Sequence, residues 1–316
     1  MQLTEADLRD QLRTDVLWGL TGSRKWLPPK WFYDARGSKL FNLITGLPEY
    51  YPSRTERALL RTAAEDIADL AYGATELVEL GSGSSEKTRL LLNALSRRGS
   101  LCSYVPQDVS ESALRSAIDW IGEEFPQLSI HGIVSDFTTM LPALPHGGRR
   151  LVALLGGTLG NLPPRERAAF LGELHRVLVP GEQVLFGIGL VTDPAVMIPA
   201  YADAAGVTAE FNRNVLRVLN DRLGADFDPF AFDHLAVWDR DLEWIEMRLV
   251  ATEPMRVTIP ELDLVVEFAA GEQMRTEISA KFRLPGFRAE LAAAGFAMRQ
   301  TWTDPAHRFA LVLAER

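Results

Sequence analysis

Between residues 76 and 190 the chain alternates short apolar runs with helical segments about every 25–30 residues, and this alternation constrains the fold most. The pattern predicts strands at 76–80, 103–107, 128–134, 149–156 and 182–190, with helices at 85–97, 110–124 and 163–178. A strand that returns to its sheet through a helix forms a parallel βαβ unit. Because the runs are continuously apolar, helices should cover both faces. We therefore expect an α/β fold with a doubly wound sheet.

The flanking sequence predicts a second, mixed unit. Before the sheet region, helices are expected in the first 25 residues, near 37–45, and from a capping box at Ser53 and Glu56 to about residue 72. After it, the pattern predicts a long helix at 195–222, an antiparallel meander at 237–279, a helix at 286–294, and strands at 296–304 and 309–315. We expect four parts: a helical part of the second, α+β unit at 1–60, the doubly wound domain at 61–194, an insertion of helix and strands at 195–284, and a C-terminal return to the main sheet at 285–316.

Composition argues against several classes of protein. Lys and Arg total 33 and Asp and Glu total 42, so the net charge of −9 disfavours binding to nucleic acid. With Cys102 as the single cysteine and five scattered histidines, neither an intrachain disulfide nor a metal site is expected. No apolar run approaches roughly 18 residues, and the N-terminus is polar and acidic, so we expect no membrane span and no targeting peptide. These features predict a soluble, cytoplasmic enzyme, and we expect it to be a monomer.

The strongest local motif is a glycine-rich turn, ELGSGSSEKT, at residues 79–88. Gly81 and Gly83 permit a tight turn and a close approach of the backbone to a ligand. The spacing matches neither the dinucleotide fingerprint, whose third glycine position holds Glu86, nor a P-loop. An E-x-G-x-G turn after a first strand is typical of nucleoside ligands without a pyrophosphate, above all S-adenosylmethionine. The alternative is a plain turn between strand and helix.

Acidic residues follow the next two predicted strands. Asp108 can accept both hydroxyl groups of a ribose, or it can cap the following helix. Asp136 can meet an adenine amino group while Phe137 stacks on the ring, or the pair can form another turn with Phe137 in the core. After the fourth strand, Gly156, Gly157 and Gly160 crowd the position of a methyl acceptor, and Asn161 can bind substrate or cap the next helix.

Several long and uncommon segments resemble the histidine Nα-methyltransferases of ergothioneine biosynthesis. They are LPPKWFYDARGSKLF (27–41), LPEYYPSRTE (47–56), ELGSGSSEKTR (79–89), GNL (160–162), AYADAAGVTAEFNRNVL (200–216), IEM (245–247), FAAGEQMRTEISAKF (268–282) and WTDP (302–305). The resemblance covers the chain from about residue 27 to its C-terminus. It implies a Rossmann-like methyltransferase sheet, with residues 61–194 binding S-adenosylmethionine. It also implies trimethylation of the α-amino nitrogen of L-histidine to hercynine.

The resemblance also implies roles for individual residues. Cofactor contacts would be Gly81, Lys87, Asp108, Asp136 and Phe137, and Tyr33 would lie close to the reacting centre as a proton acceptor or relay. Histidine contacts would be Tyr50, Gly156, Asn161, Tyr201, Met247, Glu277, Ile278 and Ser279. Among these, Asn161 and Tyr201 would hold the substrate carboxylate, and Glu277 and Ser279 would hold the imidazole. The small Gly156–Gly157 pair would leave room for the growing quaternary ammonium.

The residues themselves are compatible with these roles and with plainer ones. Glu277 and Ser279 are two apart on a predicted strand, so they share a face from which a carboxylate and a hydroxyl can address both ring nitrogens of an imidazole. The alternative is a solvated strand face. Tyr50 and Tyr201 can equally be core aromatics, and Met247, which alternates with Ile245 and Leu249, is expected to pack in the core.

Three positions depart from the family pattern. Gly189 and Thr192 stand where Asp and Lys are usual, and Gly157 stands where Ser is usual. These differences leave open a paralogue that methylates another aromatic amino acid or amine. A third interpretation is a sensor that binds S-adenosylmethionine or histidine without turnover.

Overall fold

The structure is a computed structural model that describes residues 5–141 and 148–316. The chain forms two units, each assembled from two separate stretches of sequence. The first consists of the described parts of Pro52–Thr192 and Ala280–Arg316, and the second of the described parts of Leu3–Tyr51 and Asp193–Ser279. For comparison, the sequence pattern predicts boundaries near residues 60, 194 and 284.

The first unit is built on one mixed sheet, as the alternating sequence pattern predicts. Its strands are β2 (Glu76–Leu80), β3 (Ser103–Asp108), β4 (Ser129–Ile130), β5 (Ile133–Val134), β6 (Arg150–Leu154), β7 (Gln183–Gly189), β13 (Ala297–Thr303) and β14 (Phe309–Glu315). Their order is β13-β14-β7-β6-β2-β3-β4, and β5 also pairs with β3. The strands from β7 to β4 are parallel, whereas β14 is antiparallel to both of its neighbours. The doubly wound prediction is confirmed, and its third strand is split in two.

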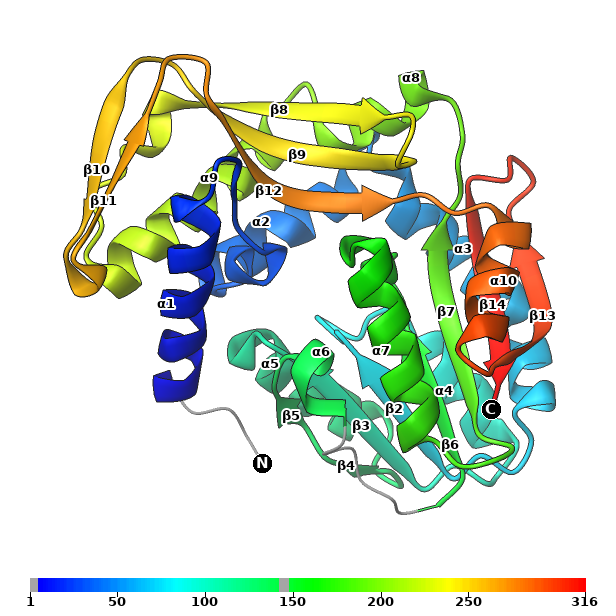
Figure 1. The fold of residues 1–316 in the computed structure, drawn as a ribbon. Coiled ribbons are helices and arrows are strands. Elements are labelled where there is room, and N and C mark those ends of the chain that lie inside the picture. The colour runs from blue at the N-terminus through cyan, green and yellow to red at the C-terminus, as the bar shows by residue number, and fades with distance from the viewer. Residues whose placement is uncertain (1–4, 142–147) are drawn as a thin grey trace. The chain divides into compact units, whose positions relative to one another are not determined.

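Helices cover both faces of this sheet. They are α3 (Tyr51–Leu70), α4 (Thr88–Arg97), α5 (Glu111–Glu124), α6 (Phe137–Met140), α7 (Pro164–Val177) and α10 (Leu284–Ala293). Apolar side chains of α3, α4 and α5 form one buried cluster with alternate residues of the strands. Figure 1 shows α7 and α10 in front of the sheet, and Phe287 of α10 makes an edge contact with Phe186 of β7, their ring centroids 5.6 Å apart.

The predicted capping box at the start of α3 is wrong. The helix begins at Tyr51, so Ser53 lies inside the first turn rather than before it. The Glu56 side chain is fully buried, and its carboxylate pairs with Lys87 and accepts the N–H of Gly156 at 2.7 Å. Because a buried carboxylate requires charged or N–H partners, Glu56 is bound by the end of the sheet and not by the start of its own helix.

The second unit combines helices with a four-stranded sheet. Its elements are α1 (Glu5–Thr21), β1 (Lys25–Trp26), η1 (Pro29–Phe32), α2 (Ala35–Gly46), α8 (Pro194–Met197), η4 (Ile198–Tyr201), α9 (Val207–Leu223), η5 (Pro229–Ala231), β8 (Phe232–Asp239), β9 (Trp244–Ala251), β10 (Met255–Ile259), η6 (Pro260–Leu262), β11 (Leu264–Phe268) and β12 (Gln273–Ala280). The strand order is β1-β12-β9-β8, while β10 and β11 form a separate hairpin. The expected meander is therefore interrupted, because β9 pairs with β12. Figure 1 shows α9 running along this sheet, beside α2.

The single long helix expected at 195–222 is also wrong. Two short helical turns, α8 and η4, precede α9, and the chain turns between Tyr201 and Val207. Gly206 adopts a positive φ of 75°, which a non-glycine residue rarely does. The Asp203 carboxylate accepts the N–H groups of Val207 and Thr208 at 2.9 and 2.7 Å, which caps α9. The break places Tyr201 at the end of a short turn rather than within a helix.

Within residues 5–141 and 148–316, we find no helix whose length and hydropathy would allow it to span a membrane.

Candidate functional site

In the first unit, the glycine-rich turn lies where the strand order reverses, between β2 and β6. Ligands of doubly wound sheets bind at this edge, beyond the carboxyl ends of the strands. The N–H groups of Gly81 and Ser82 both donate to the carbonyl of Gln107 on β3, at 2.8 and 3.0 Å. Gly81 has a positive φ of 70°, and a Cβ added there would lie 3.6 Å from the Phe137 ring. The structure therefore brings Gly81 and Phe137 together at the edge.

Asp108 holds the turn in shape. Its Oδ2 accepts the N–H of Gly83 at 2.7 Å, and its Oδ1 accepts the N–H of Ser110, the residue that precedes α5, at 2.8 Å. Burial raises the pKa of Asp108, and the amides of Ser110 and Gly83 oppose that rise. Since a carboxylate offers about four acceptor positions, these bonds leave capacity for hydroxyl donors of a ligand. Asp108 therefore holds both the turn and the start of α5, and its role in binding a ribose stays a prediction.

Asp136 and Phe137 form the third element of this edge. Asp136 caps α6, because its Oδ1 accepts the backbone N–H and the hydroxyl of Thr138 at 2.9 and 2.6 Å. The Phe137 ring is only half-buried and makes an edge contact with Phe170, with centroids 5.7 Å apart. A half-buried aromatic ring at this edge is of a kind on which an aromatic base can stack.

Glu56 is a residue of this edge that the sequence analysis missed. Its carboxylate joins the ammonium group of Lys87, in the glycine-rich turn, to the backbone N–H of Gly156, which follows β6. A Cβ at Gly187 of β7 would collide with Glu56 Oε1, so a larger residue there would displace the carboxylate from its partners. A glycine inside a buried strand is the sequence signal that could have revealed this close approach.

Two buried polar atoms at the same edge indicate a missing hydrogen-bond partner. Among the described residues, Ser82 Oγ and Gln107 Oε1 are buried without a hydrogen-bond partner. Such groups are uncommon in proteins, where more than about 90% of buried polar groups are paired. A carboxylate, an aromatic ring, an ammonium group and these two atoms therefore line one edge. This set fits a nucleoside ligand that carries an amino acid group.

Asn161 lies beyond β6, at the end of η3 (Thr158–Asn161). The residue in the cap position of α7 is Pro163, which makes no side-chain hydrogen bond to the helix, so Asn161 does not occupy that position. A Cβ at Gly160 would lie 2.8 Å from the carbonyl oxygen of Ala280, so glycine at this position lets η3 approach Ala280, which also belongs to the first unit. Gly156 and Gly157 precede this turn, both with positive φ.

In the second unit, the Tyr201 hydroxyl contacts the Ser279 hydroxyl at 2.7 Å, and both residues are buried. Burial raises the pKa of Tyr201 well above that of an ordinary tyrosine; the Ser279 hydroxyl opposes this rise, and the charge of nearby Glu277 adds to it. The phenol therefore remains protonated and can donate. Glu277 and Ser279 share one face of β12, as the sequence pattern predicts, and Tyr201 lies against that face.

Aromatic rings pack edge to face beside Tyr201. Its ring centroid lies 6.2 Å from that of Tyr50, which in turn lies 6.2 Å from that of Phe41. The Tyr33 ring contacts Phe41 and Phe211 at centroid distances of 5.6 and 5.5 Å. The structure thus brings Tyr33, Tyr50 and Tyr201 into one aromatic cluster.

Met247 and Ile278 are buried. Met247 is 2% exposed within the apolar core of the second unit, which confirms the expected packing role. Ile278 is 4% exposed and lies between Glu277 and Ser279 on β12, so its side chain lies on the opposite face.

Beneath the glycine-rich turn, Glu79 forms a buried polar cluster in the first unit. Its carboxylate accepts the hydroxyl groups of Thr88 and Tyr104, and the Tyr104 hydroxyl also contacts Ser85 Oγ at 2.8 Å. Burial raises the pKa of Glu79 to about 7, although the bonds from Thr88 and Tyr104 and the charge of Lys87 oppose the rise. Glu79 therefore links β2 to β3 and to the start of α4.

Replacing Glu79 by Gln should change how stability depends on pH. The folded-state pKa of Glu79, about 7, exceeds its usual value of 4.5, so wild-type stability falls as pH rises between these values. The unfolding free energy of Glu79→Gln minus that of wild type should therefore increase by on the order of 2–3 kcal/mol as the pH rises from about 5 to about 8. Urea unfolding at each pH measures this difference. The control Glu86→Gln, at an exposed ion pair with Arg57, should show no such trend. A gap between Glu79→Gln and wild type that does not vary with pH would contradict this expectation.

Comparison with known proteins agrees with this chemistry. The family model for histidine-specific, SAM-dependent methyltransferases matches residues 12–316. The histidine N-alpha-methyltransferase of Mycolicibacterium smegmatis is 53% identical over 307 residues, which are 97% of this chain and 95% of that protein. That of Mycobacterium tuberculosis is 51% identical over 305 residues, 96% of this chain and 95% of that protein.

A more distant relative comes from Neurospora crassa. Its ergothioneine biosynthesis protein 1 is 33% identical over 202 residues, which are 63% of this chain and 23% of that protein. Since the family model and the mycobacterial relatives cover nearly all of the sequence, the resemblance implied by the motifs is confirmed. The chain belongs to the family of histidine-specific methyltransferases that use S-adenosylmethionine.

Proposed function

We propose that this protein trimethylates the α-amino nitrogen of L-histidine to form hercynine, a step of ergothioneine biosynthesis, in the cytoplasm. The observation that carries the proposal is the arrangement of Tyr201 and Ser279 with Glu277 on β12, which offers hydroxyl and carboxylate groups to a small polar ligand. The histidine N-alpha-methyltransferases that are about half identical to this chain support the choice of substrate. The Neurospora relative supports the pathway.

The first unit would bind the methyl donor. We propose that the Asp108 carboxylate accepts the ribose hydroxyls, that Asp136 and Phe137 contact the adenine, and that Lys87 and the Gly81 turn hold the amino acid end. S-adenosylmethionine, when bound, supplies a methyl group on a positively charged sulfur. The buried carboxylates of this edge suit a cation of that kind.

The second unit would recognise the ring of histidine. Glu277 accepts an N–H of the imidazole and Ser279 addresses the other ring nitrogen, while Tyr201 donates from its protonated phenol to the carboxylate. From the family resemblance alone, we assign Asn161 to the carboxylate of the substrate and Gly156 to the space for the methylated amine. Tyr50 would complete the contacts to the amino acid.

Two demands of trimethylation are met by the aromatic cluster of the second unit. The amine must lose a proton before transfer, and we propose that the Tyr33 hydroxyl relays that proton. The product is a quaternary ammonium, and the faces of Tyr33, Tyr50 and Tyr201 can stabilise such a cation. Packing against Phe41 and Phe211 holds the Tyr33 ring in one orientation.

Product analysis tests the substrate directly. The purified protein is incubated with S-adenosylmethionine and each of the twenty amino acids, and products are resolved by mass spectrometry. We expect methylated product from histidine alone, advancing from one to three added methyl groups with time. Methylation of another amino acid in preference to histidine would favour a paralogue, and cofactor binding without release of S-adenosylhomocysteine would favour a sensor. Either result would contradict the proposal.

Replacing Glu277 by Gln should weaken recognition of the ring. A charged hydrogen bond is worth roughly 1.5–3 kcal/mol, so the KM for histidine should rise about 10- to 150-fold. The KM for an analogue whose ring cannot donate to the carboxylate should change much less. Steady-state kinetics measure both, and Glu267→Gln, an exposed glutamate of β11, serves as the matched control. Equal losses for histidine and the analogue would remove Glu277 from ring recognition.

Replacing Glu56 by Gln should weaken donor binding. The amide oxygen can still accept the Gly156 N–H, but the ion pair with Lys87 is lost, so the ammonium group loses its fixed orientation. We expect the Kd for S-adenosylhomocysteine to rise about 10-fold, measured by calorimetry. The surface variant Glu173→Gln, at an exposed ion pair with Arg176 on α7, should bind as wild type does. If Glu56→Gln retains wild-type affinity, Glu56 has no part in donor binding.

A further inference from the structure

A buried amide in the second unit has an orientation that its neighbours dictate. Asn212 of α9 is fully buried, and its Nδ2 lies 3.1 Å from the carbonyl oxygen of Arg248. A carbonyl only accepts, so this atom of Asn212 must be the N–H₂ group. The other amide atom, Oδ1, accepts the hydroxyl of Thr276 on β12 at 2.6 Å. Asn212 therefore binds α9 to β9 and to β12.

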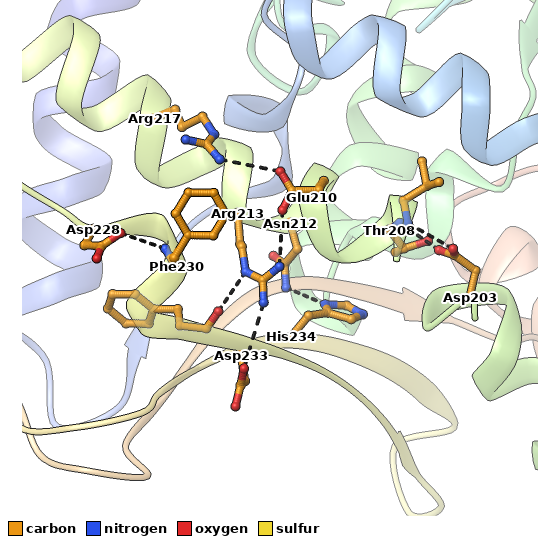
Figure 2. A network of polar contacts seen from close by, with 12 residues as sticks. Asp203, Thr208, Glu210, Asn212, Arg213, Arg217, Asp228, Phe230, Asp233 and His234 are labelled. Atoms are coloured by element: carbon orange, nitrogen blue, oxygen red, sulfur yellow. Dashed lines mark hydrogen bonds and ion pairs between the residues drawn. The ribbon is translucent and has the colours of Figure 1, made fainter. Parts of the chain in front are cut away.

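The same reasoning fixes the protonation of His234 on β8. Its Nδ1 lies 2.9 Å from Asn212 Nδ2, which donates, so Nδ1 must accept. Its Nε2 lies 2.7 Å from the carbonyl oxygen of Tyr201, so Nε2 must donate. Figure 2 shows the imidazole of His234 directed at Asn212. Only the neutral imidazole with its proton on Nε2 satisfies both contacts.

These hydrogen bonds form a network that includes the groups proposed to recognise histidine. His234 holds the main chain of Tyr201, Asn212 joins His234 to Thr276, and the Tyr201 hydroxyl meets Ser279 three residues further along β12. Thr276 and Ser279 lie on opposite faces of β12, so the strand is held from both sides. Thr276 is also fully buried, so water cannot replace its bond to Asn212.

Several charged groups surround His234. From α9, Arg213 donates to the carbonyl oxygen of Phe232 at 2.8 Å and pairs with Glu210 at 3.2 Å and Asp233 at 3.9 Å (Figure 2). On the strand paired with β8, Leu249 lies opposite His234, and the adjacent Arg248 pairs with Glu246. Asp203 lies in the turn before α9.

The balance of these groups favours the neutral ring. Burial and the charge of Arg213 lower the pKa of His234, while its bond to the Tyr201 carbonyl and the charge of Asp203 raise it, and the net direction is downward.

We propose that Asn212 and His234 are positioning residues for histidine recognition, with the neutral imidazole of His234 holding Tyr201 in place against β12. This inference rests on the proposed function, because the experiments that test it measure the binding and methylation of histidine. Neither residue needs to touch the substrate. Protonation of His234 would place an N–H at Nδ1 against the N–H₂ group of Asn212, so this hydrogen bond of the network would be lost.

Three substitutions of His234 separate the contacts. His234→Phe keeps the ring volume and removes both bonds, and we expect the KM for histidine to rise about 10-fold or more while the Kd for S-adenosylhomocysteine stays unchanged. His234→Gln can still donate from its Nε2 to the Tyr201 carbonyl and should restore most of the loss. The shorter side chain of His234→Asn can replace only the Nδ1 contact with Asn212. It loses the bond to the Tyr201 carbonyl, so this variant should resemble His234→Phe. The control His131→Phe, at an exposed position of the first unit, should behave as wild type.

A pH series adds a readout that a merely structural role would not move. At each pH, kcat/KM for histidine is measured for wild type and for His234→Gln, and the first value is divided by the second. Ionisation of the substrate affects both values equally, so it does not change this ratio. We expect this ratio to be constant at neutral pH and to fall as His234 becomes protonated in acid. Calorimetry of histidine binding in the presence of S-adenosylhomocysteine, at the same pH values, checks the trend without turnover.

The outcomes distinguish this inference from the proposed function. If wild type does not methylate histidine, the proposed function itself fails. If it does, the positioning role is overturned by an unchanged histidine KM in His234→Phe, by a failure of His234→Gln to recover more than His234→Asn, or by a ratio that does not vary with pH. Should His234→Phe not fold, the comparison of Gln with Asn and the pH series still decide.

Discussion

The buried carboxylate of Glu56 is the contact on which the geometry of the first unit's functional edge depends. A charge that is removed from water must be matched by partners nearby, and here they are the Lys87 ammonium group and the Gly156 amide. These partners come from the turns that follow two neighbouring strands. The carboxylate therefore fixes the end of β6 relative to the glycine-rich turn, and a Cβ at residue 187 would displace it from this position.

The second unit uses the same principle with uncharged groups. Asn212, His234 and Thr276 are joined by hydrogen bonds between α9 and the strands of the second sheet. Apolar packing tolerates small shifts, whereas an unpaired buried polar group costs about 1–3 kcal/mol, so such a network specifies one arrangement. In both units, buried polar contacts hold the segments to which we assign ligand binding.

The sequence predicted most of the regular structure and missed some of the features that place the functional residues. Periodicity located the strands and helices of the doubly wound sheet, because apolar alternation reports burial directly. The spacing of Ser53 and Glu56 indicated a local helix cap, because a capping box is defined by spacing alone. Such spacing cannot show that Glu56 pairs with the ammonium group of the distant Lys87. The same pattern predicted one continuous helix across Pro199 and Gly206. It therefore missed the turn after Tyr201, which the Asp203 carboxylate stabilises.

By itself, the sequence determined the fold class, the glycine-rich turn after the first strand and the family, because each of these depends on the local order of residue types. Only the tertiary structure decided that Glu56 meets Lys87, that Asn161 does not occupy the cap position of α7, and that His234 is neutral with its proton on Nε2. Those facts depend on contacts between residues far apart in the chain. Glu56 pairs with the ammonium group of Lys87 and a backbone amide, and His234 contacts the Asn212 side chain and a backbone carbonyl. No local sequence pattern shows which of these groups meet in the fold.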